Sequence, residues 1–333
     1  MFPVPQLKYS IFAVALLIGL PTGLAARAAS RPVVLTVGLK SGHFHHVQDA
    51  VNAAAKFHGR PVEIKIAAGT YHELVLVPAR MRHLTLVGAG AKRTIITFNL
   101  GAREKGPGGK PLGTFHTATV TILGRHITAA GLSFVNSYGK GSQAVAVRTG
   151  DGPVEFRHCR FISWQDTLYV HNPGAKIYLQ NCLIQGAIDF IFGKSTALFD
   201  HCNIRTVSTI PGTCLTAPAT PQDQPCGLVF LHCHVTSGKM VAPGSVYLGR
   251  PWRAYGSTLW VNCHLSAAIS PAGWRNWKGT KYFKTARFAE YHSTGPGANV
   301  KNRVTWSHQL SAAAAGKMTV RHILGRGDWS GKP

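Results

Sequence analysis

A short cysteine-containing segment recurs five times in this chain and restricts the folds that it can adopt. Each copy has an apolar residue, two further residues, a Cys, one further residue and a second apolar residue. The residue before the Cys is always His or Asn. The repeated cysteines are Cys159, Cys182, Cys202, Cys233 and Cys263, so the intervals are 23, 20, 31 and 30 residues. Short apolar strands that return at such intervals are typical of a β-solenoid, in which each coil stacks on the one before it.

Stacked coils bury equivalent positions on top of one another, so the five cysteines are expected to form one row of the core. A buried free Cys packs as a small hydrophobic side chain, and disulfides within this row are therefore not expected. Asn before Cys suits a tight bend between strands because it tolerates left-handed backbone. Elsewhere, Cys214 and Cys226 lie 12 residues apart in a Thr- and Pro-rich stretch and are the best candidates for a disulfide that closes a surface loop.

The two ends of the chain differ from the repeats, as the ends of a solenoid must. Residues 46–57 place apolar side chains on one helical face and predict a short capping helix at the N-terminal end. Residues 310–315 predict a short helix in a C-terminal tail, and the Gly-rich residues 101–113 predict a loop. We see no linker, so residues 29–333 are predicted to be a single domain.

The N-terminus has the pattern of a secretory signal peptide. Lys8 precedes the apolar residues 11–20, and Ala26-Arg27-Ala28 matches a cleavage site, which predicts removal of residues 1–28. An uncleaved membrane anchor is the alternative. No later stretch reaches the roughly 18 apolar residues of a membrane span. We therefore expect a secreted or periplasmic monomer that is free of the membrane after cleavage.

The chain is strongly basic, with 36 Lys and Arg against 12 Asp and Glu and a net charge of +24. Such a charge favours polyanionic partners. The basic residues are scattered and no nucleic-acid-binding motif is present, so export favours an acidic polysaccharide over nucleic acid. A basic surface that serves only solubility is the alternative.

Two of the few acids lie in apolar, aromatic segments that predict strands. These are Asp166 in residues 163–170 and Asp189 in residues 186–193. Their separation of 23 residues equals the interval between Cys159 and Cys182, so they are expected at equivalent places on adjacent coils. Two close carboxylates separate their pKa values, so that one is a nucleophile and the other a general acid. Spacing alone allows equally a pair of hydrogen-bonded aspartates that shape turns.

Other side chains can complete such a site. Arg250 has apolar and Pro neighbours and can hold one carboxylate ionised, although a solvent-facing charge is the alternative. Gln143 and Gln165 can donate to an oxyanion, although glutamine is usually an ordinary surface residue. The aromatic candidates for stacking on sugar rings, which in a solenoid are more often core residues, are Tyr169, Phe192, Trp252 and Trp274.

The 17 histidines raise the question of a metal site. His43, His45 and His46 lie close together, but no second group of ligands has the spacing of a metal site. His158, His201 and His232 occupy the repeat position before Cys and are interpreted as structural. No metal or other cofactor is therefore expected.

Several segments, in this order along the chain, resemble motifs of the pectin methylesterase (pectinesterase) family. The likeness covers about residues 33–329. The matching segments are Gly69-Thr-Tyr-His-Glu73, Gln143-Ala-Val-Ala-Val-Arg148, Gln165-Asp-Thr-Leu-Tyr169, Asp189-Phe-Ile-Phe-Gly193 and Leu248-Gly-Arg-Pro-Trp252.

The resemblance implies an all-β, right-handed parallel β-helix that hydrolyses methyl esters of galacturonan without a metal or organic cofactor. It implies that Asp189 is the nucleophile and that Asp166 is the general acid and then the base. It further implies that Gln143 and Gln165 stabilise the oxyanion and that Arg250 holds Asp189 ionised. Tyr169, Phe192 and Trp252 would line the sugar cleft, with Trp274 as an additional candidate.

The chain departs from the family pattern at two places. Thr117 stands where Ser is usual, and the segment 127–132 lacks the polar pair of the usual sequence. Two other functions are consistent with the same general fold. One is a pectate lyase or polygalacturonase, which needs a cluster of acids that this chain is poorly equipped to build. The other is a non-catalytic β-helix that binds pectin or another polyanion.

Overall fold

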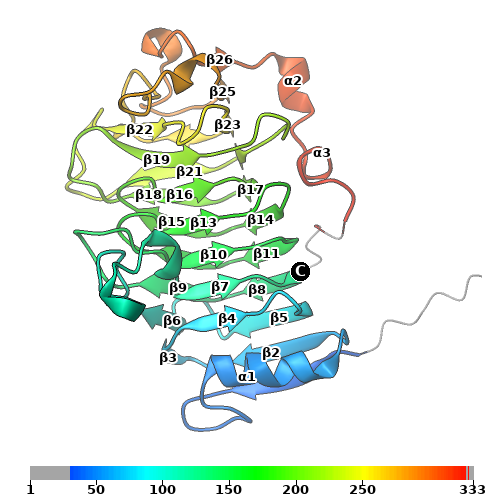
Figure 1. The fold of residues 1–333 in the computed structure, drawn as a ribbon. Helices are drawn as coiled ribbons and strands as arrows, with labels where there is room; N and C mark the ends of the chain where they lie inside the picture. Colours follow the sequence, from blue (N-terminus) through cyan, green and yellow to red (C-terminus); the bar gives the residue numbers. More distant parts are fainter. Residues whose placement is uncertain (1–30, 328, 330–333) are drawn as a thin grey trace, which may run out of the picture. The chain divides into compact units, whose positions relative to one another are not determined.

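The computed structural model describes residues 31–327 and 329, so the expected signal peptide lies outside the described residues. From Pro32 onward the chain forms one compact unit. This unit is a right-handed parallel β-helix (Figure 1), which confirms the predicted fold class. Its described strands form three parallel sheets of 11, 8 and 7 strands, here called sheets A, B and C.

Each complete coil contributes one strand to each sheet. Sheet A contains β1 (Val33–Val37), β2 (Val62–Ile66), β5 (Arg82–Gly88), β8 (Arg125–Ala130), β11 (Val154–Arg157), β14 (Lys176–Gln180), β17 (Thr196–Asp200), β20 (Leu228–Leu231), β23 (Ser257–Val261), β25 (Arg287–Tyr291) and β26 (His308–Gln309). Sheet B contains β3 (Gly69–His72), β6 (Thr94–Phe98), β9 (Ser133–Asn136), β12 (Arg160–Ile162), β15 (Leu183–Gly186), β18 (Asn203–Thr206), β21 (His234–Ser237) and β24 (His264–Leu265). Sheet C contains β4 (Val75–Val77), β7 (Val120–Ile122), β10 (Val147–Thr149), β13 (Leu168–Val170), β16 (Ile191–Gly193), β19 (Thr213–Pro218) and β22 (Val246–Gly249).

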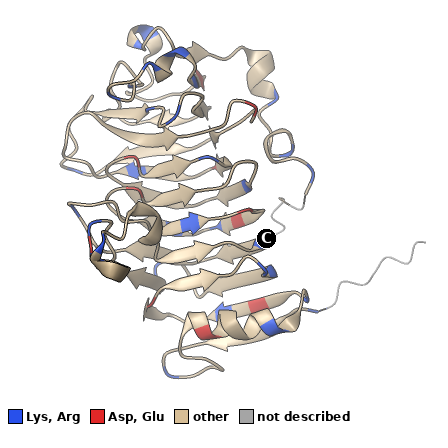
Figure 2. Cartoon of the chain, viewed as in Figure 1, with Lys and Arg blue, Asp and Glu red and all other residues tan. Residues whose placement is uncertain are grey.

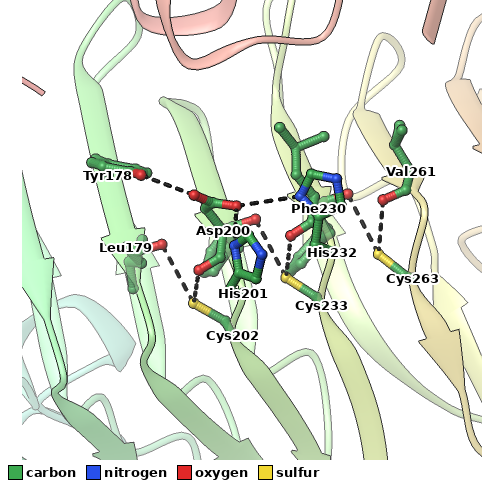
Figure 3. Close-up of polar contacts among 12 residues, drawn as sticks. Tyr178, Leu179, Asp200, His201, Cys202, Phe230, His232, Cys233, Val261 and Cys263 are labelled. Atoms are coloured by element: carbon green, nitrogen blue, oxygen red, sulfur yellow. Dashed lines mark hydrogen bonds and ion pairs between the residues drawn. The ribbon is translucent and has the colours of Figure 1, made fainter. Parts of the chain in front are cut away.

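The core consists of like side chains stacked from coil to coil. In sheet A, Phe199, Phe230 and Trp260 are fully buried and lie above one another, with ring centroids 4.5 and 3.9 Å apart. The five repeated cysteines form the expected buried row beside them. Their thiols point to backbone carbonyls, as Cys202 Sγ does to the oxygen of Leu179 at 3.4 Å (Figure 3). Parallel stacking at one strand spacing therefore converts the sequence repeat into continuous rows of the core.

The residue before each repeated Cys forms the bend between sheets A and B. These bend residues have positive φ angles of 50 to 54° and are His158, Asn181, His201, His232 and Asn262. Asn and His are among the residues that tolerate this left-handed backbone best. The predicted role of the pre-cysteine position is confirmed.

Cys214 and Cys226, the best candidates for a loop-closing disulfide, are not bonded to each other. All seven cysteines lie within the described residues and are free. Cys214 is not in a surface loop but is fully buried within β19, where its backbone oxygen accepts a hydrogen bond from the Asp189 N–H at 2.8 Å. Cys226 is half-buried just before β20.

Helices are confined to the two ends and to short turns. The capping helix α1 (Val47–Ala54), followed by the 3₁₀ turn η1 (Ala55–Phe57), is confirmed and packs on the first coil. Glu73 accepts hydrogen bonds from the first two N–H groups of α1 at 2.9 Å each, which satisfies orphan donors at its N-terminus. The remaining short helices are η2 (Pro107–Gly109), η3 (Thr114–His116), η4 (Tyr282–Lys284), η5 (Val300–Asn302), α2 (Ala312–Gly316) and α3 (Val320–Leu324).

The predicted C-terminal helix is α2, and α3 then lies against β14 and β17 of sheet A (Figure 1). None of the helices in the described residues is long and apolar enough to cross a membrane.

Candidate active site

The two candidate aspartates lie in the bends that join sheet B to sheet C. Asp166 lies between β12 and β13, and Asp189 between β15 and β16. The prediction that they lie within strands is wrong, because both have left-handed backbone, with φ angles of 64 and 47°. Asp tolerates this conformation because its short polar side chain can bond locally. The bends leave both side chains at the edge of the core, with 9% and 6% of their surfaces exposed.

The expected placement of the aspartates on adjacent coils is confirmed. Gln165 forms a parallel bridge with Ile188, one residue before each aspartate. The N–H of Asp166 donates to the oxygen of Ile188 at 3.1 Å. The interval of 23 residues between them therefore corresponds to one turn of the helix.

Arg250 binds only one member of this pair. Its Nε donates to Oδ1 of Asp189 at 3.0 Å and its Nη2 to Oδ2 at 2.5 Å, a two-point ion pair. Arg250 follows β22, two coils beyond Asp189, and the coil between them carries Ala217 next to Phe192 in the register of sheet C. The Arg250 guanidinium also stacks on the Trp277 ring, with its Cζ 4.3 Å from the ring centroid.

The two carboxyl groups have different electrostatic surroundings, which separate their pKa values. Burial and then the charge of Asp189 raise the pKa of Asp166 well above its usual value, with Arg250 opposing the rise. Burial also raises the pKa of Asp189 above its usual value, but the hydrogen bonds and charge of Arg250, and then the charge of Arg275, oppose this rise. Because Arg250 touches Asp189 alone, Asp189 loses its proton first and Asp166 keeps its own.

The two candidate glutamines lie on the coils that carry or precede Asp166. Gln165 is its chain neighbour, and the Gln165 oxygen accepts a hydrogen bond at 3.0 Å from Ala144, the residue after Gln143. Both side chains are half-buried, and neither amide hydrogen-bonds to another residue in the part of the chain that the structure describes. Their N–H groups are therefore available to a bound ligand.

An aromatic cluster lies outside the coil core, on sheet C beside the aspartates. Tyr169 and Phe192 are stacked on adjacent coils, with centroids 4.5 Å apart and an interplanar angle of 7°. Phe115 covers Tyr169 at 5.0 Å, and the half-buried Trp252 meets the edge of Phe192 at 5.9 Å. Tyr169 and Phe192 are only 2% and 4% exposed, so Phe115 and Trp252 present most of the cluster's surface.

Trp274 does not belong to this cluster, and its predicted place in the cleft is wrong. The side chain is 1% exposed and packs in the main core against Phe288 at 4.6 Å. Its Nε1 donates to Oε1 of the buried Glu290 at 3.2 Å. A parallel bridge joins the backbone of Trp274 to Gly249 at the end of β22.

Four residues around the aspartate pair were not predicted from the sequence, namely Phe115, Trp277, Arg253 and Arg275. Phe115 comes from the turn η3, and Trp277 contacts Arg250, as described above. Arg253 lies over the Trp252 ring at 4.6 Å, and Arg275 lies close enough to lower the pKa of Asp189. Proximity in the sequence to Arg250 and to Trp274 was the only signal that could have found Arg253, Arg275 and Trp277.

Comparison with known proteins agrees with this geometry. The family model described as Pectinesterase matches residues 33–328. The chain belongs to the pectinesterase family. Pectinesterase 31 of Arabidopsis thaliana is 36% identical over 281 residues, which are 83% of this chain and 87% of that relative. Pectinesterase 2 of Citrus sinensis is 36% identical over 299 residues, 87% of this chain but only 57% of that longer protein.

Solved pectin methylesterases have the same fold. The enzyme from carrot superposes with a TM-score of 0.82 at 31% identity, covering 90% of this chain and 95% of its own. That from Erwinia chrysanthemi gives 0.78 at 28% identity, covering 90% and 97%.

The two departures from the pectinesterase pattern are accommodated locally. Thr117 is fully buried, and its hydroxyl donates to the oxygen of Thr114 at 2.8 Å and accepts from the N–H of Val145 at 2.9 Å. A Ser hydroxyl can make the same two bonds. Gly131 has a φ angle of 64°, a conformation that Gly adopts without the penalty of a Cβ.

Proposed function

We propose that this pectinesterase removes methyl esters from methyl-esterified homogalacturonan, releasing methanol and leaving pectate, through a covalent intermediate on Asp189. The observation that carries the proposal is the asymmetry of the aspartate pair. Arg250 binds both oxygens of Asp189, whereas Asp166 is buried beside a like charge. The pair therefore provides an ionised nucleophile next to a protonated acid.

In the first half of the reaction, Asp189 attacks the ester carbonyl carbon and the carbonyl oxygen becomes an oxyanion. The unengaged amides of Gln143 and Gln165 donate to that oxyanion. Collapse breaks the bond to the methoxy group as Asp166 gives it a proton, so methanol leaves and an acyl-enzyme remains. Arg250 contributes by holding the attacking carboxylate in place and free of a proton.

In the second half, Asp166 is ionised and accepts a proton from water. The water attacks the acyl carbon, and collapse returns Asp189 as a carboxylate and Asp166 as an acid. The product is one free carboxylate on the polymer for each methanol released. No step requires a metal or an organic cofactor.

The surroundings of the pair suit an acidic sugar chain. Phe115 and Trp252 present aromatic faces, and Arg253 and Arg275 add positive charge beside them. Lys and Arg are also spread along the coils, while acids are few (Figure 2). A structure of a related pectin methylesterase contains a bound hexasaccharide, which supports an oligosaccharide-binding cleft here.

The competing functions are not favoured. Calcium-dependent lyase chemistry needs several acids around one ion, and polygalacturonase chemistry needs acids placed to cleave a glycosidic bond. Among the described residues, the only cluster of three or more potential metal ligands lies in a bend between sheets A and B, not at the aspartate pair. Neither does a purely binding protein account for a two-point ion pair on one of two adjacent carboxylates.

Replacement of the nucleophile tests the proposal. Asp189→Asn should fold, because the amide fits the same bend, but it should release methanol from methylated pectin at least about 1,000-fold more slowly, since the neutral amide cannot form the acyl intermediate. Asp151→Asn, an exposed aspartate in a turn, is the matched control and should keep full activity. Equal methanol release by Asp189→Asn and the control would remove Asp189 from the mechanism.

We also propose that residues 1–28 are a signal peptide and that the enzyme acts outside the cell as a monomer on wall pectin. Export is supported by the sequence pattern and by the location of the proposed substrate. Mass spectrometry of the secreted protein should find Ala29 at its N-terminus, and gel filtration should give the mass of one chain. Retention of residues 1–28 in the mature protein would contradict the signal peptide.

A further inference from the structure

Three potential metal ligands converge in one bend between sheets A and B, away from the candidate active site in the B-to-C bends. Asp200 ends β17, His201 forms the bend after it, and His232 forms the equivalent bend one coil further on. One donor atom from each residue lies within 4.8 Å of the others. Figure 3 shows the carboxylate of Asp200 directed toward the His232 ring.

The parallel register places these groups together. Asp200 pairs with Leu231, so His201 and His232 are neighbours in adjacent coils, and their rings lie 4.9 Å apart. Their φ angles of 51 and 52° make the two side chains leave the backbone in similar directions. The fold therefore holds His201 and His232 one strand spacing apart, and no flexible loop is needed to bring them together.

The donor distances suit a small metal ion. Asp200 Oδ1 lies 2.7 Å from Nδ1 of His201 and 3.6 Å from Nδ1 of His232. Donors about 2.0–2.1 Å from a tetrahedral ion lie about 3.3 Å from one another. These two distances bracket that value, and the donor atoms of the two histidines lie within 4.8 Å of each other. The 2.7 Å contact is a hydrogen bond that metal coordination would replace, and both imidazoles are exposed, so their rings have room to rotate toward a common ion.

A second residue fixes the carboxylate. The hydroxyl of Tyr178, one coil before, donates to the other oxygen of Asp200, Oδ2, at 3.0 Å. Hydrogen bonds of this kind orient the carboxylate ligands of metal sites.

No other bend in the described part of the chain has this combination. His158 occupies the same bend position on another coil, but Arg157 precedes it and Asn181 stands on the next coil. A second stacked pair, His83 and His126, lies beside arginines instead of a carboxylate.

We propose that Asp200, His201 and His232 bind one divalent transition-metal ion, with Zn²⁺ as the preferred ion. Two imidazoles and one carboxylate favour zinc and its neighbours over Mg²⁺ or Ca²⁺, which take mainly oxygen ligands. The net charge of +24 and the arginines Arg321 and Arg326, which line a cavity together with Asp200, oppose any cation. Binding must therefore come from coordination by the imidazoles, which sharpens the discrimination against Mg²⁺ and Ca²⁺.

A cavity adjoins the site on the side of Asp200, although neither His201 nor His232 lines it. It has a volume of about 820 Å³ and is lined by Tyr178, Asp200, Trp329 and the segment around α3. Three protein ligands leave at least one position of a tetrahedral ion for water or another small ligand. Because the site lies in a different set of bends from the aspartate pair, it is separate from the proposed ester hydrolysis.

Zinc titration of tag-free protein, first treated with EDTA and desalted, tests the proposal. Calorimetry should show one high-affinity Zn²⁺ per chain, and MgCl₂ or CaCl₂ should give no comparable binding. His201→Asn and His232→Asn should each weaken this binding at least about tenfold, and Tyr178→Phe should weaken it about 10–100-fold. Asn is chosen because Asn181 and Asn262 already form the same bend on other coils with φ angles of 53 and 54°.

His158→Asn is the matched control, since it makes the same change at the same bend position outside the cluster. It should bind Zn²⁺ as the wild type does. Melting temperatures measured in EDTA should agree between wild type and the Asn variants, and added Zn²⁺ should raise that of wild type and His158→Asn only. Identical zinc titrations for wild type and His232→Asn, or equal binding of Mg²⁺ and Zn²⁺, would overturn the proposal.

Discussion

Replacing Arg250 by Met should shift the pH dependence of the enzyme in a calculable way. The change removes a charge and two hydrogen bonds from Asp189 while keeping a side chain of similar length. Removing one partner of a buried ion pair costs about 3–5 kcal/mol. The Asp189 side chain is 8% exposed and that of Arg250 is 23% exposed. The lower end of that range, about 3 kcal/mol, therefore applies.

An energy of about 3 kcal/mol corresponds to about two pH units, because one unit of pKa is 1.36 kcal/mol. Arg250 favours the ionised form of Asp189, so its loss raises the pH at which the aspartate pair loses its first proton. The acid limb of the kcat profile should move upward by about two pH units. Below the limb, activity should fall by about 100-fold relative to wild type, and part of it should return at higher pH.

Methanol release measured across the pH range, with pectin at saturating concentration, checks this prediction. Arg253→Met is the matched control, because it removes an equal charge from the cleft but no hydrogen bond or ion pair to Asp189, since the Arg253 guanidinium lies over the Trp252 ring instead. Arg250→Lys should give an intermediate shift, since it keeps the charge but loses the planar two-point geometry. An acid limb that stays in place in Arg250→Met, or that moves equally in Arg253→Met, would refute the assigned role of Arg250.

Three further predictions follow from the same structure. Asp166→Asn should abolish turnover. It should also stabilise the fold relative to wild type, increasingly as pH rises, because the pKa of Asp166 is raised and wild type loses the stabilising protonated form as pH passes through the folded-state pKa. Melting curves at several pH values test this, and a pH-independent difference would contradict it. Phe230→Ala should lower the free energy of unfolding by about 3–5 kcal/mol in urea denaturation, since it removes the middle ring of the Phe199–Trp260 stack. Phe115 is 42% exposed, so Phe115→Ala should change the free energy of unfolding by less than about 1 kcal/mol. Activity on partly demethylated pectin should fall steeply between low and moderate salt, because the basic cleft attracts the product carboxylates through screened charges; a flat profile would show that this attraction is unimportant.

Much of the fold could be read from the sequence because a solenoid maps sequence intervals onto spatial neighbours. The repeated Cys positions predicted the stacked coils, and the Asn residues before them predicted left-handed bends, as Asn181 and Asn262 show. The same reasoning placed Asp166 and Asp189 on adjacent coils. The failure of the Cys214–Cys226 disulfide has a local cause, because the strand β19 runs through a stretch that its composition suggested was a loop.

The sequence by itself determined the coil repeat, the row of cysteines and the neighbourhood of the two aspartates, because these depend on regular intervals along one chain. Spacing alone did not decide which aspartate binds Arg250, which lies 61 residues from Asp189; the family resemblance implied Asp189, and the tertiary structure shows the contact. It also decided that Trp274 points inward and that Asp200 faces His232. The coils differ in length. Whether a side chain points inward or outward, and which residue it meets several coils away, therefore depends on backbone geometry that no local sequence pattern determines.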